Sequence, residues 1–466
     1  MKRRVAIIGG GPAGIAAAIR LAEAGWQPVL IEARKRLGGR ASSIHDSRTG
    51  LLLDNCQHVL LGCCTNLLDF YSRLRVIDLI RWHRKLHWTK GHGLIDTLKA
   101  GLTPAPLHLA RSLRRMQMFS AEEKRDIKAA MKRMVRMGAK GRIAWTGRTF
   151  AEFLEDCGQK ESAAYDFWST VIVSTCNLSV ERVSAATAIQ VFQDGFLGNR
   201  WSYTLGTPTV PLVELYDSAA DTIEAAGGEV QLGATARSIG YDGNRVTGVV
   251  TSNGLVEAAR VIAAVPPDRL SGLISNAMHR ADTRLRELDR ISFSPILGVH
   301  LLFDQKVMEL PHLAIVDRPL HWLFNKGVGA YGRQHLSAVI SAADEWMHLE
   351  EIEIIRRVID DVHYVLPGAR GIDPIEARAV KERHATFAPT PGVDEFRPSA
   401  KPGTIGLGGG GIHNLYLAGD WCDTGWPATM ESAVRSGYAA AAAITGTGGV
   451  VEDIPPGWLA RRLGLK

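Results

Sequence analysis

The hydrophobic pattern at the start of the chain predicts a strand, a tight turn and a helix. Residues 5–8 read Val-Ala-Ile-Ile, an apolar run typical of parallel strands buried on both faces. Apolar positions at helical spacing, including Ala18 and Leu21, follow the turn. Glycines at such a turn let the backbone approach a pyrophosphate at the helix N-terminus. The turn has G-x-G-x-x-G spacing and contains Gly9, Gly11, Pro12, Ala13 and Gly14.

A second apolar run, residues 29–32, ends in an acid, Glu32. A carboxylate at the end of the second strand can accept hydrogen bonds from ribose hydroxyls, and it repels a 2′-phosphate. Ala33 and Arg34 continue the same strand edge. Strand, glycine turn, helix and acid therefore have the spacing that predicts a dinucleotide-binding unit.

The turn that follows the second strand carries further candidate phosphate ligands. It contains Gly38, Gly39 and Arg40. Backbone N–H groups and one guanidinium in this turn can reach the same pyrophosphate. Taken alone, such a turn is more simply interpreted as a solvated basic loop.

A second segment, near the C-terminus, completes the pattern and favours FAD over NAD. The apolar residues 415–418 predict a strand that ends in Gly419 and Asp420. Asp420 can bind ribityl hydroxyls or a water on the pyrophosphate. A helix beginning near Thr429 directs its positive N-terminus at the flavin, with Pro427 and Met430 beside it.

These elements predict an α/β fold with a Rossmann-like FAD-binding domain of the glutathione-reductase type and an inserted mixed α+β substrate domain. We expect mostly helix over residues 66–205, then strands such as residues 296–303 and a helix over residues 347–365. Residues 229–232 and 235–239 should be strands, and residues 245–250 and 260–265 should continue the sheet. The predicted cofactor segments are 1–65, 206–289 and 376–447, the substrate or membrane-facing segments are 66–205 and 290–375, and 448–466 is a C-terminal tail.

Composition places the chain among globular cytoplasmic proteins. It has 466 residues, 46% of them hydrophobic, and its apolar runs are too short to span a bilayer or to form a secretory signal. The six cysteines form no C-x-x-C pair. His83 and His87 stand four residues apart without a third ligand in the same segment, so we expect no metal site.

The positive charge is concentrated in one block, residues 73–148, which contains nineteen Lys and Arg residues against five Asp and Glu residues. Within it, residues 102–119 mix apolar side chains with cations, as interfacial membrane segments do. A nucleic-acid surface is the rival interpretation, but the block has no recognisable reader motif. We therefore expect an anionic membrane surface as partner and no nucleic acid, and a peripherally membrane-associated protein.

Five further motifs occur in order along the chain: Arg36-Leu-Gly-Gly-Arg40, Asp54-Asn-Cys-Gln-His58, Val299-His-Leu-Leu-Phe-Asp304, Arg383-His-Ala-Thr-Phe387 and Ala418-Gly-Asp-Trp421. With these motifs the chain resembles the superfamily of flavin amine oxidases and phytoene desaturases, and within it the hydroxysqualene dehydroxylases, also called squalene-associated FAD-dependent desaturases. In the second motif, Cys56 stands where these proteins usually have glycine.

The resemblance implies non-covalent FAD and a reductive reaction that converts hydroxysqualene into squalene for hopanoid synthesis. It also implies a long apolar isoprenoid substrate, delivered by upstream enzymes of the squalene pathway. It places Gln57, His58 and Ala236 beside the cofactor. Asp54 and His58 become the candidate general acids, because their motif should approach the flavin; a structural role in holding the loop is the alternative.

Three other functions stay open at this point. A phytoene or diapophytoene desaturase would run hydride transfer in the oxidative direction. An amine oxidase of this superfamily would carry a lysine on the strand that corresponds to residues 294–301, and none occurs there. A non-catalytic carrier of prenyl chains, similar to Rab escort proteins, would keep the dinucleotide cleft without flavin turnover.

Overall fold

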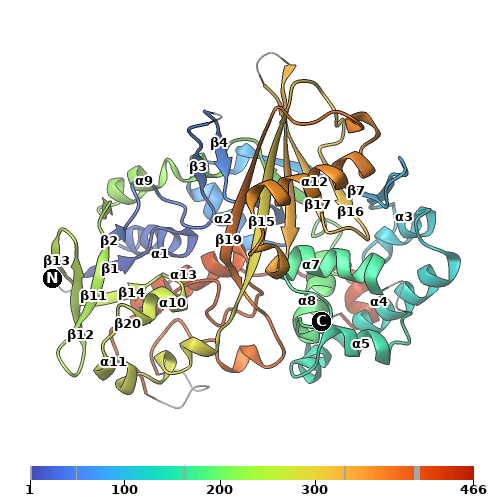
Figure 1. Ribbon diagram of the computed structural model, residues 1–466. Helices are drawn as coiled ribbons and strands as arrows, with labels where there is room; N and C mark the ends of the chain where they lie inside the picture. The colour runs from blue at the N-terminus through green and yellow to red at the C-terminus, as the bar shows by residue number, and fades with distance from the viewer. Residues whose placement is uncertain (1–2, 49, 161–163, 330–331, 404–409, 466) are drawn as a thin grey trace.

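The computed structural model describes residues 3–48, 50–160, 164–329, 332–403 and 410–465. Its first layer is a five-stranded parallel sheet with strand order β10-β2-β1-β14-β20 (Figure 1). Helices α1 (Pro12–Glu23) and α13 (Met430–Thr445) pack against each other beside this sheet. This arrangement confirms the Rossmann-like FAD-binding domain. The strands are β1 (Arg4–Ile8), β2 (Gln27–Glu32), β10 (Glu229–Leu232), β14 (Arg260–Ala263) and β20 (Leu415–Leu417).

Apolar burial explains why the ends of the chain meet in this layer. Val5 at the start of β1 is fully buried, and Leu417 in β20 is too. The helices α1 and α13 approach so closely that a Cβ atom at Gly437 would lie 2.2 Å from the carbonyl oxygen of Ala13. Only glycine permits that distance, so the first and last elements of the domain form one packed unit.

A separate three-stranded antiparallel sheet lies beside the parallel one. It consists of β11 (Ala236–Tyr241), β12 (Val246–Thr251) and β13 (Gly254–Glu257). The prediction that residues 245–250 continue the cofactor sheet was therefore wrong, whereas the same prediction for the segment from Arg260 is confirmed by β14, which pairs with β1. Short turns join these three strands, and short connections produce antiparallel hairpins rather than parallel crossovers.

The second large layer is a seven-stranded sheet with order β19-β15-β18-β17-β16-β7-β8. Its pairs are antiparallel except β16 with β7. Helix α12 (Glu351–Val365), four residues shorter at its start than expected, packs on it (Figure 1). The strands are β7 (Lys85–Thr89), β8 (Asp96–Lys99), β15 (Phe293–Phe303), β16 (His312–Ile315), β17 (Trp322–Val328), β18 (Gln334–Ser341) and β19 (Glu376–Phe387).

Two elements lie on the other side of the expected domain boundaries. Strand β19, which we assigned to the cofactor segments, pairs with β15 along most of its length. Helix α2 (Thr65–Arg73), which we assigned to the substrate segments, packs on α13 in the cofactor core. Long-range pairing decides both cases, and local sequence does not display it.

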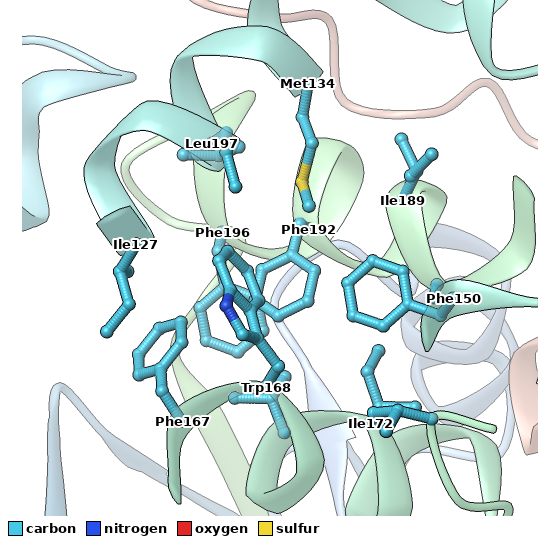
Figure 2. Close-up of a cluster of buried hydrophobic side chains, with 14 of the residues drawn as sticks. Ile127, Met134, Phe150, Phe167, Trp168, Ile172, Ile189, Phe192, Phe196 and Leu197 are labelled. Carbon is cyan, nitrogen blue, oxygen red and sulfur yellow. The ribbon is translucent and has the colours of Figure 1, made fainter. Parts of the chain in front are cut away.

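The helical region between residues 107 and 197 forms the third part of the molecule. Its core is aromatic: Phe150, Trp168 and Phe192 are fully buried, and their rings lie 4.8–6.1 Å apart (Figure 2). The helices are α3 (Ala110–Arg115), α4 (Ala121–Arg142), α5 (Phe150–Asp156), α7 (Thr170–Cys176), α8 (Ala185–Gln190) and the π-helical turns η4 (Ala164–Ser169) and η5 (Val191–Leu197).

The expectation of mostly helix over residues 66–205 was wrong for residues 80–99, which form β6 (Ile80–His83), β7 and β8. In β7, Leu86 and Trp88 are buried two positions apart, which is the period of a strand. The remaining elements are β3 (Ser43–His45), β4 (Leu52–Asp54), β5 (Leu60–Leu61), β9 (Leu205–Pro208), η6 (Leu212–Tyr216), α9 (Ala219–Ala225), α10 (Pro267–Ser271), α11 (Asn276–Ala281) and α14 (Trp458–Leu463).

Candidate active site

A cavity of about 1250 Å³ runs from the glycine-rich turn of the cofactor domain into the helical region. Its walls come from the parallel sheet, from the antiparallel sheet and from helices α7 and α8. Single small-molecule sites measure roughly 300–1,000 Å³. The cavity therefore has room for a dinucleotide and for a second ligand beyond it.

The N-terminal wall of the cavity has the geometry of an adenosine site. The Glu32 carboxylate is 9% exposed and accepts backbone hydrogen bonds from Gly10 (2.7 Å) and Arg34 (2.8 Å). Each carboxylate oxygen retains acceptor capacity for a ribose hydroxyl. A Cβ atom at Gly14 would lie 1.9 Å from the carbonyl oxygen of Gly9, so the helix can start this close to the turn only with glycine.

An ion pair joins the two halves of the site. The Arg40 guanidinium contacts the carboxylate of Asp420, 380 residues later in the chain, and also donates to the carbonyl oxygen of Ala385 (2.8 Å). Both charged groups line the cavity. The pair holds the N-terminal turn, β19 and the C-terminal strand end in one place.

The C-terminal wall presents a helix N-terminus to the cavity. Thr429 caps α13 by accepting a hydrogen bond from the Ser432 N–H (3.2 Å), and Met430 begins the helix. Pro427, Thr429 and Met430 all line the cavity. The positive end of the helix dipole thus faces the space where an electron-rich ring would lie.

Most of the predicted cofactor ligands meet at this cavity. Gly14 and Gly38 do not line it, although Gly38 supports it by donating to the carbonyl oxygen of Gly10 (2.8 Å). The predicted residues that line it are Gly9, Gly11, Pro12, Ala13, Glu32, Ala33, Arg34, Gly39, Arg40, Gln57, His58, Ala236, Gly419, Asp420, Pro427, Thr429 and Met430.

Asp54 has a structural environment rather than a catalytic one. Its buried carboxylate accepts hydrogen bonds from the Ser43 hydroxyl (2.7 Å), the Leu212 N–H (2.9 Å) and the Lys326 ammonium (2.9 Å). Burial raises its pKa, but Lys326 and the hydrogen bonds outweigh burial, and the net pKa is lowered. Asp54 is not one of the described residues that line the cavity. The assignment of Asp54 as proton donor is therefore not supported, because an ionised anchor cannot donate a proton.

His58, the other candidate acid, lines the cavity. Its Nδ1 atom is buried and has no hydrogen-bond partner among the described residues. Burial lowers the pKa of His58, so the ring is neutral near pH 7. A neutral imidazole carries one N–H donor and one acceptor, and His58 stays a candidate for contacting a ligand.

Cys56 keeps the backbone shape that glycine would have at its position. Its φ is 59°, in the left-handed region that favours glycine. The thiol is buried, and burial raises the pKa of Cys56 to about 12. The backbone of the loop that carries Gln57 and His58 thus has, at Cys56, the conformation that glycine favours.

Sequence reasoning missed two charged residues of the site. Lys326 lies on β17, 272 residues from Asp54, and no local motif marks it. Glu431 lines the cavity at 0% exposure and accepts hydrogen bonds from the Leu67 N–H (2.7 Å) and the Arg435 guanidinium (2.7 Å). An acid in the first turn of a predominantly apolar helix, four residues before Arg435, was the available signal for Glu431.

A third histidine, His312, lies beside the pair formed by His83 and His87. The ring of His312 lies 5.0 Å from that of His83 and 5.6 Å from that of His87. In the described part of the chain, no group of three His, Cys, Asp or Glu side chains is arranged to hold a metal ion. No helix in the same described ranges combines the length and the apolarity needed to cross a bilayer.

Comparisons with known proteins agree with this geometry. The 15-cis-phytoene desaturase of Synechococcus elongatus is 26% identical over 95% of both chains. The hydroxysqualene dehydroxylase of Zymomonas mobilis is 26% identical over 93% of this chain and 97% of its own. A putrescine oxidase structure shares the fold with a TM-score of 0.71 at 17% identity, covering 96% of this chain and 100% of that chain.

A family model described as flavin containing amine oxidoreductase matches residues 12–445. The match includes the helix after the glycine turn, Arg40, Asp420 and all of α13. The cofactor is FAD, and the protein is an FAD-dependent oxidoreductase that belongs to the flavin-containing amine oxidoreductase family.

Proposed function

We propose that the protein removes the hydroxyl group of hydroxysqualene reductively and forms squalene. The observation that carries this proposal is the apolar length of the cavity beyond the cofactor end. Its walls there include Leu61, Leu86, Trp88, Val171, Trp322 and Phe324. Such a surface fits a long hydrocarbon chain, because apolar side chains gain free energy by covering apolar ligand area.

Several polar groups in these walls are paired within the protein, whereas the indole N–H of Trp88 is buried without a partner among the described residues. The indole N–H of Trp322 donates to the Ser174 hydroxyl (2.6 Å), and the Asn177 amide donates to the carbonyl oxygen of Ser294 (3.0 Å). A hydrocarbon therefore meets few unpaired donors along the cavity. When bound, FAD supplies the capacity to accept or donate a hydride; the residues of the chain orient the substrate and exclude water.

The relatives support two substrate classes equally, because a hydroxysqualene dehydroxylase and a phytoene desaturase match this chain at the same identity. Phytoene-type desaturation is the second candidate function. The absence of a lysine from residues 294–301 in the sequence is the observation against an amine oxidase; the nearby Lys326 is held by Asp54 and Gln57 (2.9 and 3.2 Å).

The reaction direction is tested anaerobically. The photoreduced protein should convert hydroxysqualene into squalene in a single turnover while its flavin absorbance recovers. In deuterated buffer, one deuterium should be found at the former carbinol carbon. Reduction of the oxidised protein by phytoene or squalene, with release of a more unsaturated product, would instead establish the desaturase.

We further propose that the helical region docks on an anionic membrane surface, from which such a substrate would enter. Leu102 is 96% exposed and Leu107 is 45% exposed, and three exposed cations of α3 follow in the chain: Arg111, Arg114 and Arg115. Exposed apolar side chains flanked by cations are the pattern of interfacial segments.

A further inference from the structure

One carboxyl group in the cavity has no part in cofactor binding or in the anchors described above. Asp194 lies on the π-helical turn η5, and its side chain lines the cavity. The side chain keeps 40% of its surface accessible although it lies deep among protein atoms, because it borders this internal space. Single π-helical turns of this kind are frequent at functional sites.

Neighbouring contacts place Asp194 toward the cofactor end of the cavity. One turn earlier, the Gln190 amide donates to the carbonyl oxygen of Gly425 (2.8 Å), in the loop that leads into α13. A Cβ atom at Gly195 would lie 3.4 Å from the side chain of Leu61, three residues after His58. Asp194 therefore sits between the end of α8, the His58 loop and the start of α13.

The other described carboxylates that line the cavity are occupied by close partners. Their contacts are Glu32 with the Gly10 N–H (2.7 Å), Asp268 with the His384 ring (3.2 Å), Glu382 with the Asn55 amide (2.8 Å), Asp420 with Arg40, and Glu431 with the Leu67 N–H (2.7 Å). Asp194 differs. Its cationic neighbour Arg142 is 3.6 Å away and donates to the Gln193 amide oxygen (3.1 Å).

The charges around Asp194 come from three elements, and the Gln190 side chain adds one hydrogen bond to the carboxyl group. Arg142 approaches from α4, Arg435 from α13 and Asp453 from the C-terminal tail. Arg435 is itself paired with Asp453 and with Glu431. Burial raises the pKa of Asp194 and the Asp453 charge raises it further, while Arg142, the hydrogen bond from Gln190 and Arg435 reverse this only in part. A carboxyl group that tends toward its neutral form is compatible with an apolar ligand beside it.

We propose that Asp194 binds the hydroxyl group of the alcohol substrate and so makes the cavity prefer an alcohol to the corresponding hydrocarbon. The inference rests on the proposed function and names the group that recognises its substrate. A neutral carboxyl donates a hydrogen bond to the hydroxyl oxygen, and an ionised one accepts a bond from the hydroxyl proton. In either state Asp194 supplies one polar contact in walls that are otherwise suited to a hydrocarbon.

The test measures binding without turnover. Hydroxysqualene and squalene are titrated, in detergent micelles, into the oxidised FAD-loaded protein while flavin absorbance and tryptophan fluorescence are followed. The parent should bind the alcohol more tightly than the hydrocarbon. Asp194→Leu should lose about a two- to thirteenfold preference, the range that corresponds to one hydrogen bond. Asp194→Asn should retain most of it, because an amide donates and accepts at the same position.

Asp156→Leu is the matched control. Asp156 lies in the same helical region, is 44% exposed, and pairs with Arg133 on α4 outside the cavity wall. This variant should keep the parental preference, and FAD content together with circular dichroism should show that all variants fold. An unchanged preference in a folded Asp194→Leu protein, or a parent that binds both ligands equally, would overturn the role of Asp194.

The proposed function can fail separately. If the parent prefers the alcohol through Asp194 but the photoreduced protein forms no squalene, the binding role stands and the dehydroxylase reaction is wrong. If squalene forms and Asp194→Leu binds like the parent, the reaction stands and the role of Asp194 is wrong.

Discussion

At the scale of single residues, the site is built from charged groups that hold other parts of the protein. Glu32 binds one backbone N–H group of the glycine-rich turn and one of the turn that follows its own strand, Arg40 binds Asp420, and Asp54 binds Lys326. The sequence predicted Glu32, Arg40 and Asp420 as cofactor ligands because each belongs to a short local motif. It could not predict the Asp54 anchor, because Lys326 comes from a distant strand.

Replacing Glu32 by Ala should weaken FAD binding. The change removes a charged acceptor that faces the ribose side of the cavity, a loss of about 1.5–3 kcal/mol. We expect the FAD dissociation constant, measured by flavin fluorescence quenching, to rise by roughly ten- to 150-fold. Glu229→Ala is the control, since Glu229 lies on the same sheet in an exposed pair with Arg4. Equal affinity of the Glu32→Ala protein and the parent would remove Glu32 from the ribose site.

Replacing Asp54 by Asn should destabilise the fold in a pH-dependent way. Removing one partner of a buried ion pair costs about 3–5 kcal/mol, because the Lys326 charge is left without compensation. The folded-state pKa of Asp54 lies below its ordinary value of 3.8. Its contribution is therefore fully present above about pH 5 and is lost as the pH falls through the folded pKa.

Urea unfolding of parent and Asp54→Asn from pH 7 down to acid measures this effect. The gap in the free energy of unfolding should be largest at neutral pH and should shrink in acid. A gap that is constant across the range would show that the Asp54 charge does not carry the stability.

At the scale of elements, the prediction was accurate where a pattern is local and failed where pairing is distant. The unit from β1 to β2 and the helix at Thr429 were predicted from strand runs, glycines and a cap. Strands β6 and β7 are only four and five residues long, too short for a period of two to stand out. Strand β19 has no marker for its pairing with β15.

The contact between α1 and α13 gives a prediction at this scale. Gly437→Ala would place a Cβ atom 2.2 Å from the carbonyl oxygen of Ala13, so the two helices must separate. We expect a loss of stability of about 1–3 kcal/mol, as for overpacked cores, together with weaker FAD binding. Thermal unfolding and FAD titration measure both. Gly147→Ala is the control, because nothing lies within 4 Å of a Cβ atom at that position.

If Gly437→Ala unfolds at the same temperature and binds FAD like the parent, the close helix contact does not position the cofactor site. A loss of stability with unchanged FAD affinity would confine the role of Gly437 to folding.

At the scale of the whole molecule, the two terminal segments and the strands β10 and β14 form one cofactor site, and the helical region and the seven-stranded sheet form the cavity beyond it. The C-terminal tail joins the helical region: the Gly457 N–H donates to the carbonyl oxygen of Gly198 (2.8 Å), next to η5. A Cβ atom at Gly457 would lie 3.8 Å from Ala105. The exposed Trp458 of α14 (62%) therefore stands near the loop that carries Leu102.

This proximity extends the proposed membrane surface beyond the basic block, and it predicts the effect of charge reversal. Changing Arg111, Arg114 and Arg115 to Glu should weaken binding to phosphatidylglycerol vesicles by more than a hundredfold, because each cation near an anionic surface contributes about 1 kcal/mol. The control variant changes three other exposed arginines to Glu, on the cofactor side of the molecule: Arg245, Arg280 and Arg286. This variant has the same change of net charge, so the two triple variants differ only in the position of the charges. Vesicle sedimentation at low and physiological salt should separate them, with the larger difference at low salt. Equal binding by both triple variants would show that overall charge, and not the surface around α3, attracts the protein to the membrane.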